Sequence, residues 1–128
     1  SRGSLGRADA ETIHAIARLW ETTPRETGLS VALGELAERS SDAEPFPIPS
    51  PVKWVKLGLA GCAHDPAWIV RWGASRTRWE AASGRRLRWI AVAYADHVRA
   101  DAPAVDAVLA AAIETACTGL LVDTWDKQ

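Results

Sequence analysis

Short apolar segments alternate with amphipathic helical segments along this 128-residue chain, and that alternation leaves few folds open. Four apolar runs are bounded by glycine, proline or polar residues, which is typical of buried strands. They span residues 29–33, 52–59, 87–94 and 119–123. Strands that alternate with helices usually pair in parallel, so the pattern predicts an α/β fold whose parallel sheet is covered by helices.

Three segments have the apolar spacing of helices. The first spans residues 10–22 and follows Asp9, a residue type that often caps helices. The second opens with Asp65 and Pro66 and ends before Gly84, so both of its ends carry cap signals. We interpret its aromatic stripe as core packing against the sheet. That stripe comprises Trp68, Trp72 and Trp79.

The third helix opens at Pro103 and precedes the last strand. Its predicted apolar face comprises Val105, Val108, Leu109, Ala112, Ile113 and Ala116. By contrast, residues 36–51 are polar and then proline-rich, which excludes a helix or a central strand from their second half.

Residues 1–128 thus form one partial domain of four strands, three helices and the proline-rich loop 36–51. The chain opens on a helix with no strand before it and closes on a strand with no helix after it. A four-stranded parallel arc leaves edges and one face uncovered. We therefore expect a fragment of a larger α/β fold.

The composition excludes several classes of function. A net charge of -1 gives no electrostatic basis for binding nucleic acid or an anionic membrane surface. No apolar run approaches the roughly 18 residues that a membrane span needs. Cys62 and Cys117 form no paired motif, and the histidines lack metal-ligand spacing. We expect no metal, no disulfide and a cytoplasmic location.

Titratable side chains gather where the predicted strands end, which is where parallel α/β folds place their active sites. Lys56 lies inside an apolar strand, and burial there lowers a lysine pKa toward the range of a general base or Schiff-base amine. Asp96 and Asp123 follow the next two strands and could hold a lysine or shuttle protons, although such aspartates often only cap the next helix. Lys127 comes four residues after Asp123. Glu35 ends the first strand but opens a long polar loop, so it is a weaker candidate.

Glycine-rich turns at two places could bring backbone N–H groups close to a phosphate. The candidate phosphate-binding residues are Gly3, Ser4 and Gly6 near the start of the chain and Gly58 after the second strand. Glycine also simply permits tight turns, so this signal is weak on its own.

Five short motifs occur in a fixed order at these positions. They are GSLG at residues 3–6, SVALGE at 30–35, VKLGL at 55–59, AYAD at 93–96 and LVDT at 121–124, followed by Lys127. In this order they resemble the (5-formylfuran-3-yl)methyl phosphate synthases, also called 4-(hydroxymethyl)-2-furancarboxaldehyde-phosphate synthases. The resemblance runs over essentially the whole chain. It implies about the middle half of a (β/α)8 TIM barrel, a fold that takes roughly 250 residues.

Membership of that family implies a carbon-oxygen lyase that condenses two glyceraldehyde 3-phosphate molecules, with loss of phosphate and water, for methanofuran-type cofactor biosynthesis. The resemblance implies catalysis by lysines without a metal or other cofactor. By the same resemblance, Lys56 corresponds to the acid/base lysine, and Asp123 and Lys127 complete the pocket. The family's Schiff-base lysine belongs to a DVKxP stretch before the GSLG loop, which this sequence does not contain. We therefore expect the activity in the parent protein and not in residues 1–128 alone.

Two alternatives stay open. A class I aldolase-like barrel acting on another sugar phosphate would carry the same strand-end lysines. A truncated, non-catalytic barrel module would form no imine with a carbonyl substrate, and its exposed apolar edges would favour a homo-oligomer. Nucleic acid is not an expected partner, because the tryptophans follow helical spacing.

Overall fold

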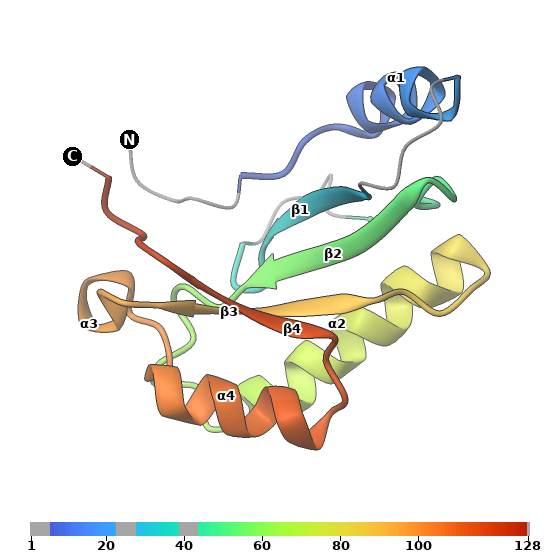
Figure 1. Cartoon of the computed structure of the whole chain (residues 1–128). Coiled ribbons are helices and arrows are strands. Elements are labelled where there is room, and N and C mark those ends of the chain that lie inside the picture. The colour runs from blue at the N-terminus through green and yellow to red at the C-terminus, as the bar shows by residue number, and fades with distance from the viewer. Residues whose placement is uncertain (1–5, 23–27, 39–43, 128) are drawn as a thin grey trace.

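The computed structural model describes residues 6–22, 28–38 and 44–127. Its centre is a four-stranded parallel sheet in the order β1-β2-β3-β4. The strands are β1 (Leu29–Glu35), β2 (Val52–Gly58), β3 (Trp89–Tyr94) and β4 (Gly119–Asp123). Strands that are consecutive in the chain therefore lie side by side (Figure 1). The predicted parallel α/β fold is confirmed, although β1 continues beyond the predicted end to Glu35.

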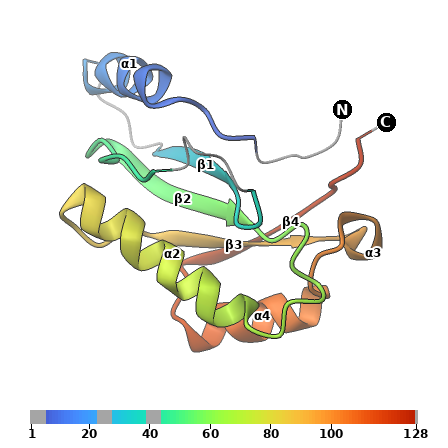
Figure 2. The same ribbon diagram turned by 180° about the vertical axis from the view of Figure 1, so that it is seen from behind.

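The helices are α1 (Ala10–Glu21), α2 (Trp68–Ser83), α3 (His97–Ala100) and α4 (Val105–Glu114). Figures 1 and 2 show α2 and α4 on the same side of the sheet, while α1 lies beyond β1. The short helix α3 follows β3 and was not predicted. It ends at Ala100, and the next residue, Asp101, adopts the left-handed conformation (φ 51°).

The predicted start of α2 was wrong. The helix begins at Trp68, after an N-cap residue, Ala67, that makes no side-chain cap. Asp65 instead holds the preceding turn, because its carboxylate accepts the N–H of Ala67 at 2.9 Å and pairs with Arg71. The predicted end was confirmed, since Gly84 terminates the helix in the left-handed conformation (φ 65°).

The predicted apolar face of α4 was only partly correct. Val108 and Ala112 are buried as predicted, but Ala111 is buried too, while Leu109 and Ile113 are 43% and 74% exposed. The helix packs on β3 and β4, so it buries a narrow stripe centred on Val108.

The tryptophan stripe of α2 packs into the core as predicted. Trp72 and Trp79 are buried on the face of the sheet that α2 and α4 cover, and Trp68 packs partly buried against the same cluster. The ring of Phe46 meets Trp79 edge to face, with 5.0 Å between ring centroids. This contact ties the end of the proline-rich segment to α2.

The opposite face of the sheet carries polar groups, and we call it the inner face. Lys56 lies on this face, and its ammonium group bonds the Ser30 hydroxyl. The strand register places Ile90 of β3 opposite Lys56, so Ile90 lies on the same face. Side chains alternate along a strand, so Tyr94 of β3 points the same way as Ile90. Asp123 pairs directly with Tyr94 and therefore also belongs to this face.

The described residues 36–38 and 44–51 form turns and irregular backbone, in agreement with the predicted loop. Among the residues that the structure describes, no helix is long and apolar enough to cross a membrane. The whole therefore shows a parallel sheet flanked by helices, an arrangement consistent with an arc of a barrel.

Candidate active site

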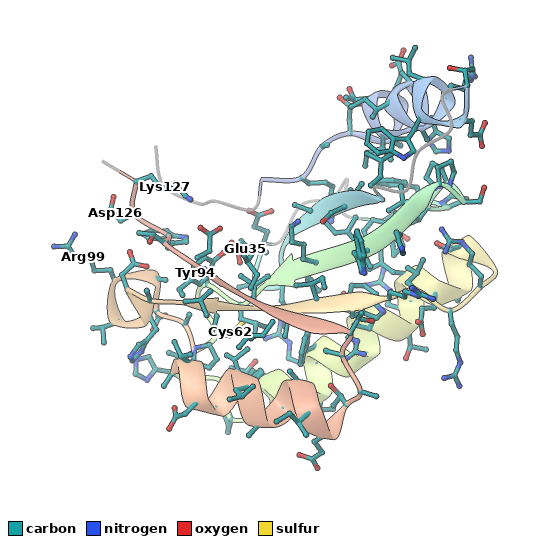
Figure 3. All side chains as sticks on the ribbon, in the orientation of Figure 1. Glu35, Cys62, Tyr94, Arg99, Asp126 and Lys127 are labelled. Carbon is teal, nitrogen blue, oxygen red and sulfur yellow. The ribbon has the colours of Figure 1, made fainter. Side chains whose placement is uncertain are left out.

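Glu35 lies at the carboxyl end of β1, and its carboxyl group accepts two hydrogen bonds from other elements. Its Oε1 accepts the hydroxyl of buried Tyr94 at 2.5 Å, and its Oε2 accepts the N–H of Ala60 at 3.1 Å. Figure 3 shows Glu35 and Tyr94 pointing toward each other from β1 and β3. Burial raises the pKa of Glu35, and the two hydrogen bonds, which favour the carboxylate, only partly oppose that rise.

Gly58 makes room for this carboxyl group. It lies opposite Glu35 in the register of β1 and β2, and a Cβ atom at Gly58 would overlap the Glu35 carboxylate. Only glycine leaves that space open. The phosphate-binding role predicted for Gly58 stays a prediction, and the structure shows that its immediate neighbour is Glu35.

Lys56 lies on the inner face two residues before Gly58. Its Nζ donates to the Ser30 hydroxyl at 2.5 Å. Partial burial lowers the pKa of Lys56, and the negative charge of Asp123 opposes that shift. The lowered pKa agrees with the direction expected for a lysine inside an apolar strand.

Asp123 links the lysines and Glu35 electrostatically. Its Oδ1 lies 2.9 Å from the Nζ of Lys127, so these two predicted residues are brought together. The charge of Asp123 adds to the burial-driven rise in the pKa of Glu35 and opposes the burial-driven fall in the pKa of Lys56. Groups from β1, β2 and β4 thus act on one another across one site.

Asp96 uses both carboxylate oxygens to hold the chain after β4. Oδ1 accepts the N–H of Trp125 at 2.9 Å and Oδ2 accepts that of Asp126 at 3.0 Å. These bonds, led by the one from Trp125, lower the pKa of Asp96. Asp126 in turn lies 3.5 Å from Arg99. The arrangement favours a positioning role for Asp96, and its predicted catalytic role stays a prediction.

A cavity of about 460 Å³ opens beside Glu35 at this end of the sheet. Its walls come from the loop after β1, the loop after β2, helix α3 and the segment after β4. They comprise Glu35, Ala37, Glu38, Ala60, Gly61, Arg99, Ala100, Asp101 and Trp125. Carboxyl ends of parallel strands are where α/β folds bind small molecules, and this cavity lies there.

The N-terminal phosphate candidates are placed only in part. Gly3 and Ser4 lie outside the described residues. Gly6 is exposed and has open space where a Cβ would lie. Its neighbour Arg7 reaches the end of β1, where its Nε donates to the carbonyl of Leu33 at 3.2 Å.

The cysteines are free thiols, as expected without a disulfide. Cys62 is buried, and this burial raises the pKa of its thiol to about 11, so it is a poor nucleophile. Among residues 6–22, 28–38 and 44–127 no group of three or more His, Cys, Asp or Glu side chains is arranged to hold a metal ion.

The sequence patterns did not predict the contact between Glu35 and Tyr94. Glu35 was assigned low weight because of the loop that follows it, and Tyr94 was not singled out. The signal available was the position of both residues at strand ends. What the sequence lacked was the contact, because the two residues are 59 positions apart.

The fold and the site define a class of protein: a parallel α/β chain with lysines and carboxyl groups gathered at the carboxyl ends of its strands. The chain matches the 4-HFC-P synthase family over residues 1–128 and belongs to that family, which is named for a synthase. The predicted resemblance is thereby confirmed. No curated protein and no solved structure gives a significant match to the chain.

Proposed function

We propose that the full-length protein condenses two molecules of glyceraldehyde 3-phosphate into (5-formylfuran-3-yl)methyl phosphate, with loss of phosphate and water. The product would serve the biosynthesis of methanofuran-type cofactors. Family membership over residues 1–128 supports this reaction class. In this proposal the sheet is an arc of a (β/α)8 barrel, and β1 to β4 contribute one side of its active-site rim.

The observation that carries the proposal is the position of Lys56. An amine that is partly desolvated loses its proton more readily than a free lysine, which suits it to proton transfer. Lys56 would exchange protons with the substrate during the eliminations. Asp123 and Lys127 would complete the pocket as an ion pair, and a lysine Schiff base would activate the carbonyl group.

A substrate assay with matched lysine variants tests this proposal. The full-length protein receives glyceraldehyde 3-phosphate, and the conjugated furan aldehyde is followed by its ultraviolet absorbance. We expect product from the wild type and a loss of about 10²- to 10⁴-fold in Lys56→Ala. Lys53→Ala is the control, because Lys53 lies on the same strand, is exposed and points away from the inner face.

Product formation with equal losses in both variants would contradict the role of Lys56. A folded wild type that forms neither product nor an imine trapped by borohydride would contradict the synthase proposal. That second result would favour a non-catalytic barrel module. Product from a different sugar phosphate alone would favour the aldolase-like alternative.

A further inference from the structure

The Glu35 carboxyl group is held in one position by three independent features. Tyr94 reaches it from β3, the Ala60 N–H reaches it from the loop after β2, and Gly58 leaves the space it occupies. A carboxyl group whose only role was to accept a hydrogen bond from a loop would not require a glycine next to it. Glu35 also lines the cavity at the carboxyl ends of the strands.

Glu35 of β1 and Lys56 of β2 lie on the same face of two neighbouring strands, and each bonds a different partner. Glu35 lies opposite Gly58, and Lys56 precedes Gly58 by two residues on the same face. The Cα atoms of Lys56 and Gly58 are separated by roughly 7 Å along β2, and Glu35 lies across from Gly58 on the neighbouring strand. Lys56 bonds Ser30 and Glu35 bonds Tyr94, so the described contacts direct the two groups to different partners. A substrate bound over this face could contact both groups, because they come from adjacent strands.

Burial acts on the two groups in opposite senses. It raises the pKa of Glu35 and lowers that of Lys56, which brings both closer to neutral pH. A carboxylate with a raised pKa is a stronger base, and an ammonium with a lowered pKa is a stronger acid. At a pH between the two values Glu35 is ionised and Lys56 is protonated, so both groups are in the reactive form.

We propose that Glu35 is the general base that works with Lys56 as general acid in an elimination of water from the substrate, and that Tyr94 positions Glu35 for this step. The proposal rests on the synthase function proposed above. It adds a residue from β1 to the lysines and the aspartate that the family resemblance identifies.

The Glu35 carboxylate takes a proton from the carbon next to the carbonyl or imine group, and the electrons of that C–H bond form a carbon–carbon double bond. The neighbouring C–O bond breaks, and the departing oxygen takes a proton from the Lys56 ammonium and leaves as water. The Glu35 carboxyl then returns its proton to Lys56 through solvent.

Glu35→Gln is the decisive variant because glutamine keeps both hydrogen bonds. Its amide oxygen can accept the Ala60 N–H, and its amide nitrogen can donate to the Tyr94 oxygen. The fold should therefore survive while the proton acceptor is lost. The matched control is Glu114→Gln, which removes an exposed carboxylate at the end of α4.

The full-length protein and its variants are assayed with glyceraldehyde 3-phosphate over a range of pH. We expect Glu35→Gln to lower kcat about 100-fold or more, to leave KM within about threefold, and to remove the limb in which activity rises with pH. Tyr94→Phe removes a bond that favours the carboxylate. It should therefore move that limb to higher pH and lower kcat less than Glu35→Gln does. Glu114→Gln should match the wild type.

Each outcome bears on a different statement. The role of Glu35 is overturned if the wild type forms product and Glu35→Gln is equally active. It is also overturned if the rise of activity with pH is unchanged in both variants. The synthase function stands in either case. A folded wild type that forms no product overturns the synthase function and this inference with it. If Glu35→Gln does not fold, the pH profile of Tyr94→Phe tests the proposal. The proposal is overturned if activity in that variant rises over the same pH range as in the wild type.

Discussion

The two faces of the sheet are made by the same four strands but carry different kinds of side chain. The face beneath α2 and α4 is filled by large apolar side chains such as Trp72, Trp79 and Val108, all nearly inaccessible to solvent. The inner face presents Lys56 and Asp123, together with the Tyr94 hydroxyl. Because side chains alternate along a strand, each strand supplies both environments.

Adjacent residues of β2 show what this division teaches. Leu57 is 3% exposed and belongs to the covered core, while Lys56 beside it bonds Ser30 and responds to the charge of Asp123. Two adjacent residues of β2 therefore contribute differently: Leu57 stabilises the fold by packing, and Lys56 belongs to the proposed proton chemistry. The predictions below test whether the two contributions separate in this way.

Substituting each of the adjacent residues by alanine should give the largest effects and opposite phenotypes. Leu57→Ala should lower the free energy of unfolding by about 2–5 kcal/mol, because it leaves a cavity in the covered core. Lys56→Ala should lower product formation about 10²- to 10⁴-fold with little change in the free energy of unfolding. Denaturant unfolding and the furan aldehyde assay measure the two effects. A large loss of stability in Lys56→Ala would mean that the two faces are not separable.

Gly58→Ala should sharpen the comparison by altering the inner face alone. The added methyl group overlaps the Glu35 carboxylate and must displace it from Tyr94 and Ala60. A displacement of about 1 Å at a catalytic group can lower a rate about 100-fold, so we expect a loss of that order in kcat. Gly73→Ala is the control, because Gly73 lies in α2 with open space around its Cα. Equal activity of the two variants would contradict the importance of the Glu35 position.

The pH dependence of stability should separate Glu35 from ordinary carboxyl groups. The folded-state pKa of Glu35 is raised, so its contribution to stability is present below the unfolded pKa and is lost as pH rises through the folded pKa. Glu35→Gln does not ionise and should therefore gain stability relative to the wild type as pH rises through that value. Unfolding midpoints measured at several pH values test the trend. A gain that is independent of pH would argue against the raised pKa.

Asp96 should show the opposite pH dependence and the smallest effect. Its folded-state pKa is lowered, so its contribution is present above the unfolded pKa and is lost as pH falls through the folded pKa. Asp96→Asn should be modestly less stable than the wild type near neutral pH, and the difference should shrink in acid. Hydrogen exchange at the amides of Trp125 and Asp126 gives a local measurement, because both donate to Asp96. Unchanged exchange at those amides would contradict the positioning role.

The sequence was sufficient to predict the sheet but not the details at its carboxyl end. Apolar runs between glycines and prolines indicated all four strands, since the face covered by α2 and α4 requires apolar side chains from every strand. The start of α2 was missed because Asp65 uses its side chain to bond the turn and Arg71. Helix α3 was missed because its four residues are too short to show a helical period.

The sequence predicted which residues lie at the strand ends of the candidate site, but not the contacts that they make there. Lys56, Asp123 and Lys127 were singled out by position, and the structure brings the last two into contact through the non-helical segment after β4. The bonds of Glu35 and Asp96 depend on register and on loop conformation, which single-sequence patterns do not specify. Glu35 was a weaker candidate because a long polar loop follows it, and only the register of the strands shows its contact with Tyr94.

The indole of Trp125 on the wall of the cavity gives the protein an optical probe of its own occupancy. Tryptophan emission responds to the polarity around the ring, and a bound molecule would replace water beside Trp125. The rings of Trp72 and Trp79 are sealed in the core and should keep a constant emission. A fluorescence titration of the wild type minus that of Trp125→Phe would therefore follow ligand binding without turnover. The rate of ligand binding could in this way be measured separately from the rate of the reaction.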